Sequence, residues 1–210
     1  LIFAGFGGCA TGVLDPEFGD GGIVQIYFGG GDSVARAVVA QADGKVLVAG
    51  TAMVAYQRRF ALARLHPDGS LDTAFGSGGL VTTAVEGLPS SAKALALLGN
   101  GKIVLAGHAG EESQHHFALA RYNSDGTLDS SFGSGGTVLA PVGTASDSAV
   151  GVAVLWTGRI VVGGSFYDSP TVNGFALARF TPGGLLDSTF GSGGVAKYSL
   201  GRGTVTATAM

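Results

Sequence analysis

The chain has 210 residues, of which 38 are glycine, 46% are hydrophobic and only 13% are charged. Disordered chains are rich in charge and poor in apolar residues, so this composition excludes an intrinsically disordered protein. The net charge is −3 and the longest basic run is Arg58-Arg59, which argues against a nucleic-acid-binding surface. Glycine and proline interrupt the uncharged stretches, whereas a membrane span needs about 20 mostly apolar residues. With the single cysteine, Cys9, no internal disulfide can form.

Four segments near the start of the chain predict β-strands. Residues 23–28 (IVQIYF) are apolar or β-branched, and residues 33–41 (SVARAVVAQ) roughly alternate. A turn signal at Asp43-Gly44 leads to the short apolar run 45–50 (KVLVAG), and residues 60–65 (FALARL) give the last strand. The segments are too short and too interrupted by glycine for a helical period to persist.

This pattern recurs along the chain. LDPEFGDGG begins at Leu14, and close copies begin at Leu71, Leu128 and Leu186, at spacings of 57, 57 and 58 residues. FALAR begins at Phe60, Phe117 and Phe175, and KVLVAG-like segments begin at Lys45, Lys102 and Arg159. Three markers in one order and at one period indicate an internal repeat. The repeats are predicted at 14–70, 71–127 and 128–185, with a partial copy at 186–210 and a separate segment at 1–13.

Four antiparallel strands per repeat predict an all-β fold, a β-propeller of four-stranded blades, with a β-sandwich or a solenoid as the alternatives. The order G-x-LD-x-x-FG-x-GG, an apolar strand, DGK-[IV]-[LV]-[VL]-[AG]-G and FALAR[YFL] resembles the bacterial delta-60 repeat over residues 13–210. The resemblance implies β-propeller repeats in secreted or surface-located bacterial proteins, many of which have no assigned activity. Such proteins usually carry more repeats than this chain does.

The ends of the chain allow three interpretations. Residues 1–5 (LIFAG) match the KVLVAG-like strands and predict a fourth blade, shared with strands at Val195–Leu200 and Thr204–Met210. Alternatively, LIFAGFGG is a signal-peptide remnant, with Cys9 in a loosely lipoprotein-like FGGC context. In the third interpretation the chain is part of a larger propeller. The sequence leaves all three open.

Charged and aromatic residues recur once per repeat. An aspartate follows the repeated leucine, an arginine ends FALAR and a phenylalanine precedes the repeated glycine. They are Asp15, Asp72, Asp129 and Asp187; Arg64, Arg121 and Arg179; and Phe18, Phe75, Phe132 and Phe190. Because an active site is rarely repeated in every unit of an array, we interpret them as ion pairs, turn caps and core residues that join one blade to the next.

Motifs for catalysis or for a metal are weak. His115 and His116 are neighbours, which point to opposite faces of a strand, and His108 would leave a metal site short of a third ligand. Glu111 and Glu112 lack a repeated partner. The chain has no G-x-S-x-G elbow and no phosphate-binding fingerprint. We therefore predict no catalytic residues, no bound metal and no cofactor.

Variable loops suggest where a partner binds. The loops between the first and second strands, and between the third and fourth, differ among repeats and are expected on one face. Loops on a rigid scaffold carry most binding sites, and aromatic residues and arginine are common anchors. The predicted binding residues are Tyr56, Arg58, Arg59, His115, His116, Phe166, Tyr167 and Asp168. Loops that drift without constraint would give the same pattern.

The sequence favours a non-enzymatic scaffold, located outside the cell, on its surface or in the bacterial periplasm. It is expected to bind a protein partner or to enter a larger assembly, with self-association through open blade edges as one route. A hydrolase or lyase acting on polysaccharide is the second hypothesis, since propellers host such sites. A structural spacer without a specific ligand is the third.

Overall fold

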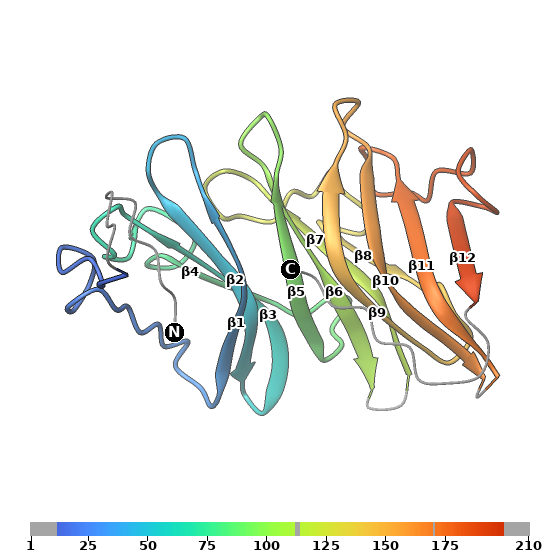
Figure 1. Cartoon of the computed structure of the whole chain (residues 1–210), viewed down its shortest axis with the longest axis horizontal. Coiled ribbons are helices and arrows are strands. Elements are labelled where there is room, and N and C mark those ends of the chain that lie inside the picture. The colour runs from blue at the N-terminus through green and yellow to red at the C-terminus, as the bar shows by residue number, and fades with distance from the viewer. Residues whose placement is uncertain (1–11, 112–113, 170, 200–210) are drawn as a thin grey trace.

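The computed structural model describes residues 12–111, 114–169 and 171–199, which fold into twelve β-strands. Within these ranges there is no helix able to cross a membrane. The strands form three four-stranded antiparallel sheets that stand side by side (Figure 1). The all-β prediction is therefore confirmed, and the alternation of short strands with glycine turns is what produces it.

Each sheet has its strands in chain order. The first contains β1 (Ser33–Ala40), β2 (Val46–Val54), β3 (Gln57–Leu65) and β4 (Leu80–Thr83). The second contains β5 (Ser90–Leu97), β6 (Ile103–Glu111), β7 (Gln114–Tyr122) and β8 (Thr137–Ala140). The third contains β9 (Ser146–Val154), β10 (Ile160–Ser169), β11 (Val172–Phe180) and β12 (Val195–Ser199).

The sheets are offset from the sequence repeats. β4 follows the second LD motif in the chain, yet it pairs with β3 of the first repeat, and β8 and β12 pair in the same way with β7 and β11. Every sheet thus takes three strands from one repeat and its outermost strand from the next. A strand shared in this way ties consecutive repeats together through backbone hydrogen bonds.

This offset changes two expectations for the ends. Residues 25–28 form no strand, although 23–28 was predicted as one; the preceding segment to which such a strand would pair falls in residues 1–11, outside the described ranges. The strand at the C-terminal copy, β12, lies in the third sheet rather than in a shared fourth blade. The remaining parts of that predicted blade, residues 1–5 and 204–210, also lie outside the described ranges.

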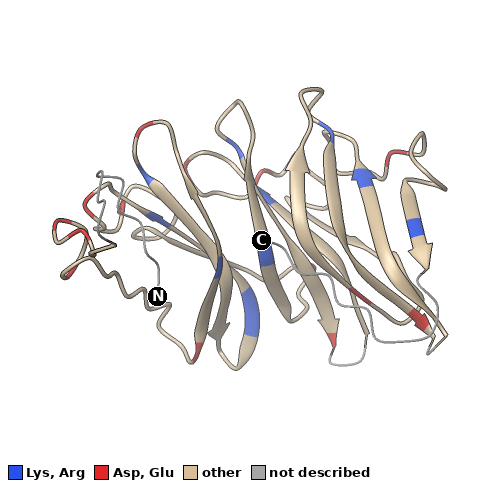
Figure 2. Ribbon diagram, viewed as in Figure 1, with Lys and Arg blue, Asp and Glu red and all other residues tan. Residues whose placement is uncertain are grey.

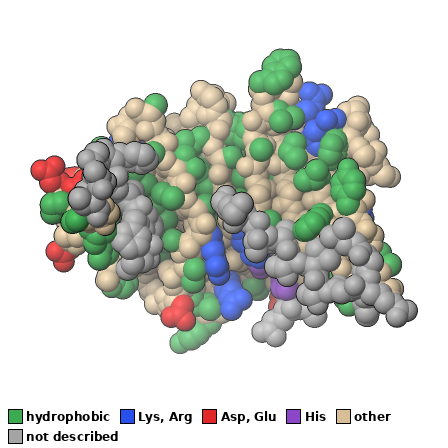
Figure 3. Space-filling model, viewed as in Figure 1, with side chains coloured by type: hydrophobic (Ala, Val, Ile, Leu, Met, Phe, Trp, Pro, Cys, Tyr) green, Lys and Arg blue, Asp and Glu red, His purple; other side chains and the backbone are tan. Residues whose placement is uncertain are grey.

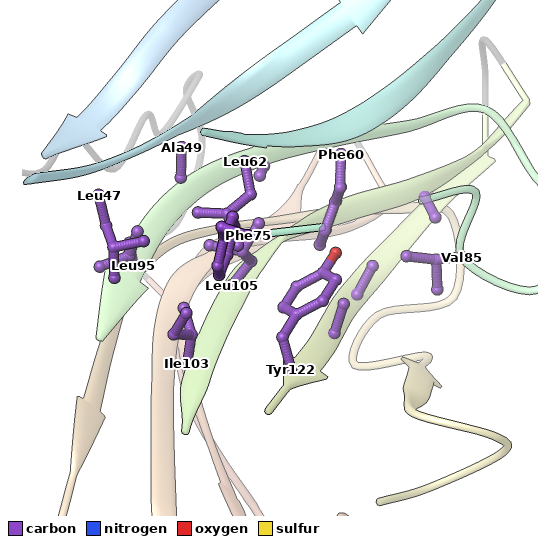
Figure 4. Packing of buried hydrophobic residues seen from close by; sticks show 14 residues of the cluster. Leu47, Ala49, Phe60, Leu62, Phe75, Val85, Leu95, Ile103, Leu105 and Tyr122 are labelled. Atoms are coloured by element: carbon purple, nitrogen blue, oxygen red, sulfur yellow. The ribbon is translucent and has the colours of Figure 1, made fainter. Parts of the chain in front are cut away.

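Apolar layers fill the space between neighbouring sheets. Leu47, Phe60, Leu62 and Phe75 meet Leu105 and other residues of the second sheet (Figure 4). An equivalent cluster joins the second and third sheets, with Phe117, Leu119 and Phe132 on one side and Ile160 and Val162 on the other. Because strand residues alternate between faces, a sheet between two neighbours needs apolar residues on both faces, which explains the nearly continuous apolar runs.

The two ends of each sheet carry different connections. One end holds the hairpin turns of the β2–β3 type and the loops that lead into β5 and β9; we call it the hairpin edge. The opposite end holds the Asp-Gly turns and the LD-x-x-FG motifs; we call it the turn edge. The register of the strands therefore brings both kinds of variable loop to one edge.

Candidate functional site

At the turn edge, the recurrent residues form the same contacts in each sheet. Nε of Arg64 donates to Oδ2 of Asp72 at 2.8 Å, and the corresponding distances are 2.6 Å for Arg121 and Asp129 and 2.9 Å for Arg179 and Asp187. The three arginines also lie over the rings of Phe75, Phe132 and Phe190, at 4.4, 4.4 and 4.7 Å from the ring centroids. The carboxylates are buried, so each is held by its arginine within the wall of the sheet.

A second cation reaches each of these carboxylates. Nζ of Lys45 lies 2.9 Å from Oδ2 of Asp72, Lys102 reaches Asp129 at 2.6 Å, and Arg159 reaches Asp187 at 2.8 Å. The hydrogen bond from Lys45, together with those from Ala74 and Arg64, lowers the pKa of Asp72 to about 2 despite burial. The carboxylates are therefore ionised at neutral pH. Their charge is balanced by side chains of the same sheet.

The same motif connects one repeat to the next. The amide of Gly76 donates to the carbonyl of Asp125 at 2.8 Å, and Nη1 of Arg64 donates to the carbonyl of Ser124 at 2.5 Å. Between the second and third sheets, Arg121 donates to the carbonyl of Pro182 in the same manner. A Cβ placed on Gly126, whose φ is +88°, would lie 2.9 Å from the amide nitrogen of Gly76. This close approach requires glycine.

Asp15 and Phe18 occupy the equivalent positions of the first copy. Phe18 is buried, and the amide of Gly19 donates to the carbonyl of Asp68 at 2.8 Å, as in the later repeats. Asp15 accepts a hydrogen bond from the amide of Glu17 at 3.0 Å. No ion pair to Asp15 occurs among the described residues, and the sequence has Gly7 at the position that carries arginine in the other repeats.

Three of the predicted binding residues are held by internal contacts. Phe166 is buried among the residues between the second and third sheets, so its prediction as an exposed anchor is wrong. Successive residues of a strand point to opposite faces, so Phe166 of β10 points into the space between the sheets while Tyr167 lies on the exposed side. Asp168 accepts from the amide of Thr144 at 2.6 Å and from Nζ of Lys197 at 3.1 Å, which fixes the loop before β9.

His116 is also part of a loop anchor. Its Nδ1 lies 3.3 Å from Oδ2 of Asp147, a fully buried carboxylate that accepts hydrogen bonds from the amides of Val142 and Gly143 at 2.7 to 2.8 Å. Asp147 stands where the other two repeats have Ser33 and Ser90, and this single difference gave no reason to select it from the sequence. Arg59 has its Nε buried without a hydrogen-bond partner among the described atoms.

Three other predicted residues meet in one hollow. A cavity of about 730 Å³ opens at the hairpin edge between the first and second sheets. We call it the hairpin-edge hollow; its walls include Tyr56, Arg58, Ser91, His108, Glu111 and His115. Tyr56 is fully exposed at the tip of the β2–β3 hairpin, where both Ala55 and Tyr56 have positive φ. The structure thus brings Tyr56, Arg58 and His115 together and leaves Tyr167 in another sheet.

A polar cluster continues from the hollow toward the third sheet. Nζ of Lys93 donates to Oγ of Ser148 at 2.8 Å, and the same oxygen lies 3.2 Å from Nδ1 of His108. Nδ1 of His115 lies 2.9 Å from Oγ of Ser146, and the two imidazole rings are edge-to-face at 4.9 Å. Burial, with the nearby charge of Lys93, lowers the pKa of His108 to about 4. Among the described residues, no group of three potential metal ligands is present.

Lys93 reaches this position through a β-bulge. Each of β1, β5 and β9 has a register shift at the same place, and the extra residue is Arg36, Lys93 and Val150 respectively. A bulge re-aims the side chain of its extra residue and is common beside functional sites. Arg36 and Lys93 are visible in the sequence as charged residues within otherwise small and apolar strands. The bulge that places them has no distinct sequence signature.

An exposed apolar face lies on the outside of the third sheet. Phe175 and Leu177 of β11 have exposed fractions of 41% and 37%, whereas the equivalent Phe60, Leu62, Phe117 and Leu119 are 0% exposed. Tyr198 on the paired strand β12 is 59% exposed. FALAR is identical in all three repeats, so the sequence alone could not distinguish the buried copies from the exposed one.

Four-stranded antiparallel sheets that stack face to face, one per sequence repeat, define blades of the β-propeller class. In agreement, residues 41–75, 98–132 and 157–190 match the family model described as domain of unknown function (DUF5122) beta-propeller. Each match ends on the phenylalanine of LD-x-x-F and includes both residues of the Arg–Asp pair. The three repeats are therefore β-propeller repeats. None of the curated proteins compared with the chain matches it.

Proposed function

We propose that this chain is a non-enzymatic scaffold of the delta-60 repeat type, secreted or surface-located, that assembles through the outer face of its third sheet. The observation that supports this proposal most directly is the exposure of Phe175 and Leu177. The same two residues of the first and second repeats are completely buried by the sheet that follows.

The occupant that fits this face is a blade of the same kind, contributed by a second copy of the chain. In the first two repeats, the cover for this face is always the next repeat, which presents Ile103 and Leu105 or Ile160 and Val162. Residues Val46 and Val48 are their equivalents in the first sheet. Val46 and Val48 are buried beneath Phe18 and the segment that carries Val24, Ile26 and Phe28. A head-to-tail contact between the third sheet of one copy and the first sheet of another would therefore repeat the contacts of the inner sheets after that segment moves aside.

At the turn edge too, the third repeat lacks, among the described residues, the contacts that a following repeat provides to the first two. Phe75 and Phe132 are fully buried and pack against Gly126 and Gly184 of the next repeat, whereas Phe190 is only partly buried. Head-to-tail contacts of this type close into a ring when the rotation permits and otherwise grow as a filament. Either assembly would cover the exposed face.

A double substitution, Phe175→Ser with Leu177→Asn, tests this proposal. Light scattering combined with small-angle X-ray scattering, over a range of concentrations, should show assembly of the unaltered chain and a monomer for the double variant. Trp156→Ser is the matched control, because Trp156 is 97% exposed in the β9–β10 turn of the same sheet, away from the outer face of β11. A chain that stays monomeric at every concentration, or a double variant that assembles as before with an unchanged circular dichroism spectrum, would contradict the proposal.

A further inference from the structure

We propose that the hairpin-edge hollow binds an oxyanion, the phosphate, sulfate or carboxylate group of a ligand, through Arg58, His108 and His115, with Lys93 supplying charge behind the histidines. This site is separate from the assembly face on the third sheet. It concerns a ligand rather than another blade, so it stands independently of the proposed assembly.

The hydrogen bonds around Ser148 allow the proton of His108 to be assigned to one ring nitrogen. An ammonium group can only donate, so Oγ of Ser148 accepts from Nζ of Lys93 at 2.8 Å. Its own hydroxyl can donate to Nδ1 of His108, 3.2 Å away, and this is the arrangement that we assign to the site. With Nδ1 as acceptor, the neutral ring carries its proton on Nε2. His108 is therefore a hydrogen-bond donor at the atom that the serine leaves free.

The charges around the hollow are mostly positive. Lys93 and Arg58 both lie near enough to His108 and His115 to lower the pKa of each histidine, and Arg36 acts on Lys93 in the same way. Arg58 lies on β3 and Lys93 on β5, and Figure 2 shows basic residues on both strands. In Figure 3, Lys, Arg and His side chains lie near one another on the face shown. Glu111 is the acidic residue in the described wall.

No ion pair joins Lys93, Arg36 or Arg58 to a carboxylate of the described ranges, although most other basic residues there have one. A half-buried lysine without an acidic partner is costly, and a bound anion would offset that cost. Guanidinium, ammonium and imidazole N–H groups together are the donors that proteins use for phosphate and carboxylate.

The same arrangement disfavours a metal cation. Lys93 and Arg58 would repel it, and an imidazole that carries its proton on Nε2 cannot coordinate through that atom. The serine partners occupy the Nδ1 atoms of His108 and His115. An oxyanion accepts the hydrogen bonds that these groups still offer.

Sister repeats supply substitutions that the fold already accommodates. At the position of Lys93, the third repeat has Val150, and at the position of Arg58 it has Asn173. At the position of His108, the first repeat has Thr51, whose hydroxyl bonds directly to Ser91 at 2.6 Å. The combination of two histidines, lysine and arginine is therefore specific to the junction around the second sheet.

The proposal is tested by titrating the full chain with inorganic phosphate, sulfate and acetate at constant ionic strength, with chloride as the balancing salt. Two-dimensional NMR of the imidazole nitrogens should show saturable shifts of His108 and His115, while His66 at the turn edge serves as an internal reference. Calorimetry gives the affinity. Phosphate or sulfate saturating before acetate would indicate a tetrahedral ligand group, and the reverse order a carboxylate.

Arg58→Asn and Lys93→Val should each weaken binding of the favoured anion at least tenfold. Lys197→Val removes the same charge from the third sheet and should leave the affinity within twofold. Affinity for sulfate, which does not titrate in this range, should rise as the pH falls from 7.5 to 5.5, because protonation of His115 adds charge next to the anion. Arg58, Lys93, His108 and Glu111 are the other charged or titratable groups around it. No saturable shift with any of the three anions, equal shifts of all histidines, or equal loss in Lys197→Val would overturn the site, as would saturation by Zn²⁺ alone.

Discussion

The turn edge has the same contacts in every repeat, whereas the contacts at the hairpin edge differ from one junction to the next. At the turn edge, the arginine, aspartate and phenylalanine contacts recur with nearly the same distances in three sheets. At the hairpin edge, corresponding positions hold Thr51 and Ser91 at one junction but His108 and Ser148 at the next. The repeated edge therefore determines how repeats join, while the other edge is free to differ and can acquire a site.

The difference is also one of electrostatics. Buried carboxylates at the turn edge are satisfied by two cations each, so little charge is left for a ligand. At the hairpin edge, Lys93 has a serine as its partner, and burial lowers its pKa. A site that lacks its own counter-charge is the one that can gain free energy from an anion.

The largest test of this contrast is acid denaturation, because it acts on every repeat together. The pKa values of Asp72 and Asp187 are about 2 in the folded chain, against 3.8 ordinarily, so they stabilise the fold above that ordinary value. Their contribution is lost as the pH falls from about 5 to 2, because the unfolded chain binds the protons first. The folded chain disfavours protonated His108, whose pKa is about 4 against 6.5 ordinarily. Stability therefore also falls in a higher window, as the pH decreases from about 6.5 to 4.

Stability measured by urea unfolding at a series of pH values should therefore fall in two phases. His108→Thr, which introduces the residue found in the first repeat, should reduce the upper phase and leave the lower one. The remainder of the upper phase belongs to His115, whose pKa burial also lowers. A single phase that the substitution does not alter would show that the hairpin edge makes no separate contribution.

The sequence predicted the repeated edge well and the variable edge poorly. The spacing of LD-x-x-F and FALAR predicted all-β sheets and the pairing of charged residues, because each contact is written three times in the chain. The sequence did not predict that the fourth strand of each sheet comes from the following repeat. A repeat pattern shows which strands recur, but it does not show whether β4 pairs with β3 before it or with β5 after it. The role of Asp147 and the burial of Phe166 occur once each, and one copy gives no pattern to compare. The bulge recurs in all three sheets, but its extra residue is Arg36, Lys93 or Val150, so the sequence shows no common feature at that position.

Arg121→Ala and Arg179→Ala are a matched pair at the turn edge. Arg121 is buried and donates to both Asp129 and the next repeat, so its loss should destabilise the chain by about 3 kcal/mol, as for other broken buried pairs. The side chain of Arg179 is 23% exposed and, among the described residues, bonds only within its own repeat motif, to Asp187 and Thr189, so its loss should cost about 1 kcal/mol. Urea unfolding gives both values; equal losses would mean that contact with a following repeat adds nothing.

The smallest expected difference comes from two glycines with positive φ. Gly126 and Gly135 have φ values of +88° and +60°, so alanine at either is strained by about 1–2 kcal/mol. A Cβ at Gly135 meets no atom within 4 Å, whereas at Gly126 it would meet the amide nitrogen of Gly76 at 2.9 Å and the ring of Phe75 at 3.0 Å. Gly126→Ala should therefore cost about 1 kcal/mol or more beyond Gly135→Ala, as overpacking does elsewhere. Both are measured by urea unfolding, and equal costs would show that the approach of one repeat to the next is not tight at this turn, since only Gly126 lies at a junction.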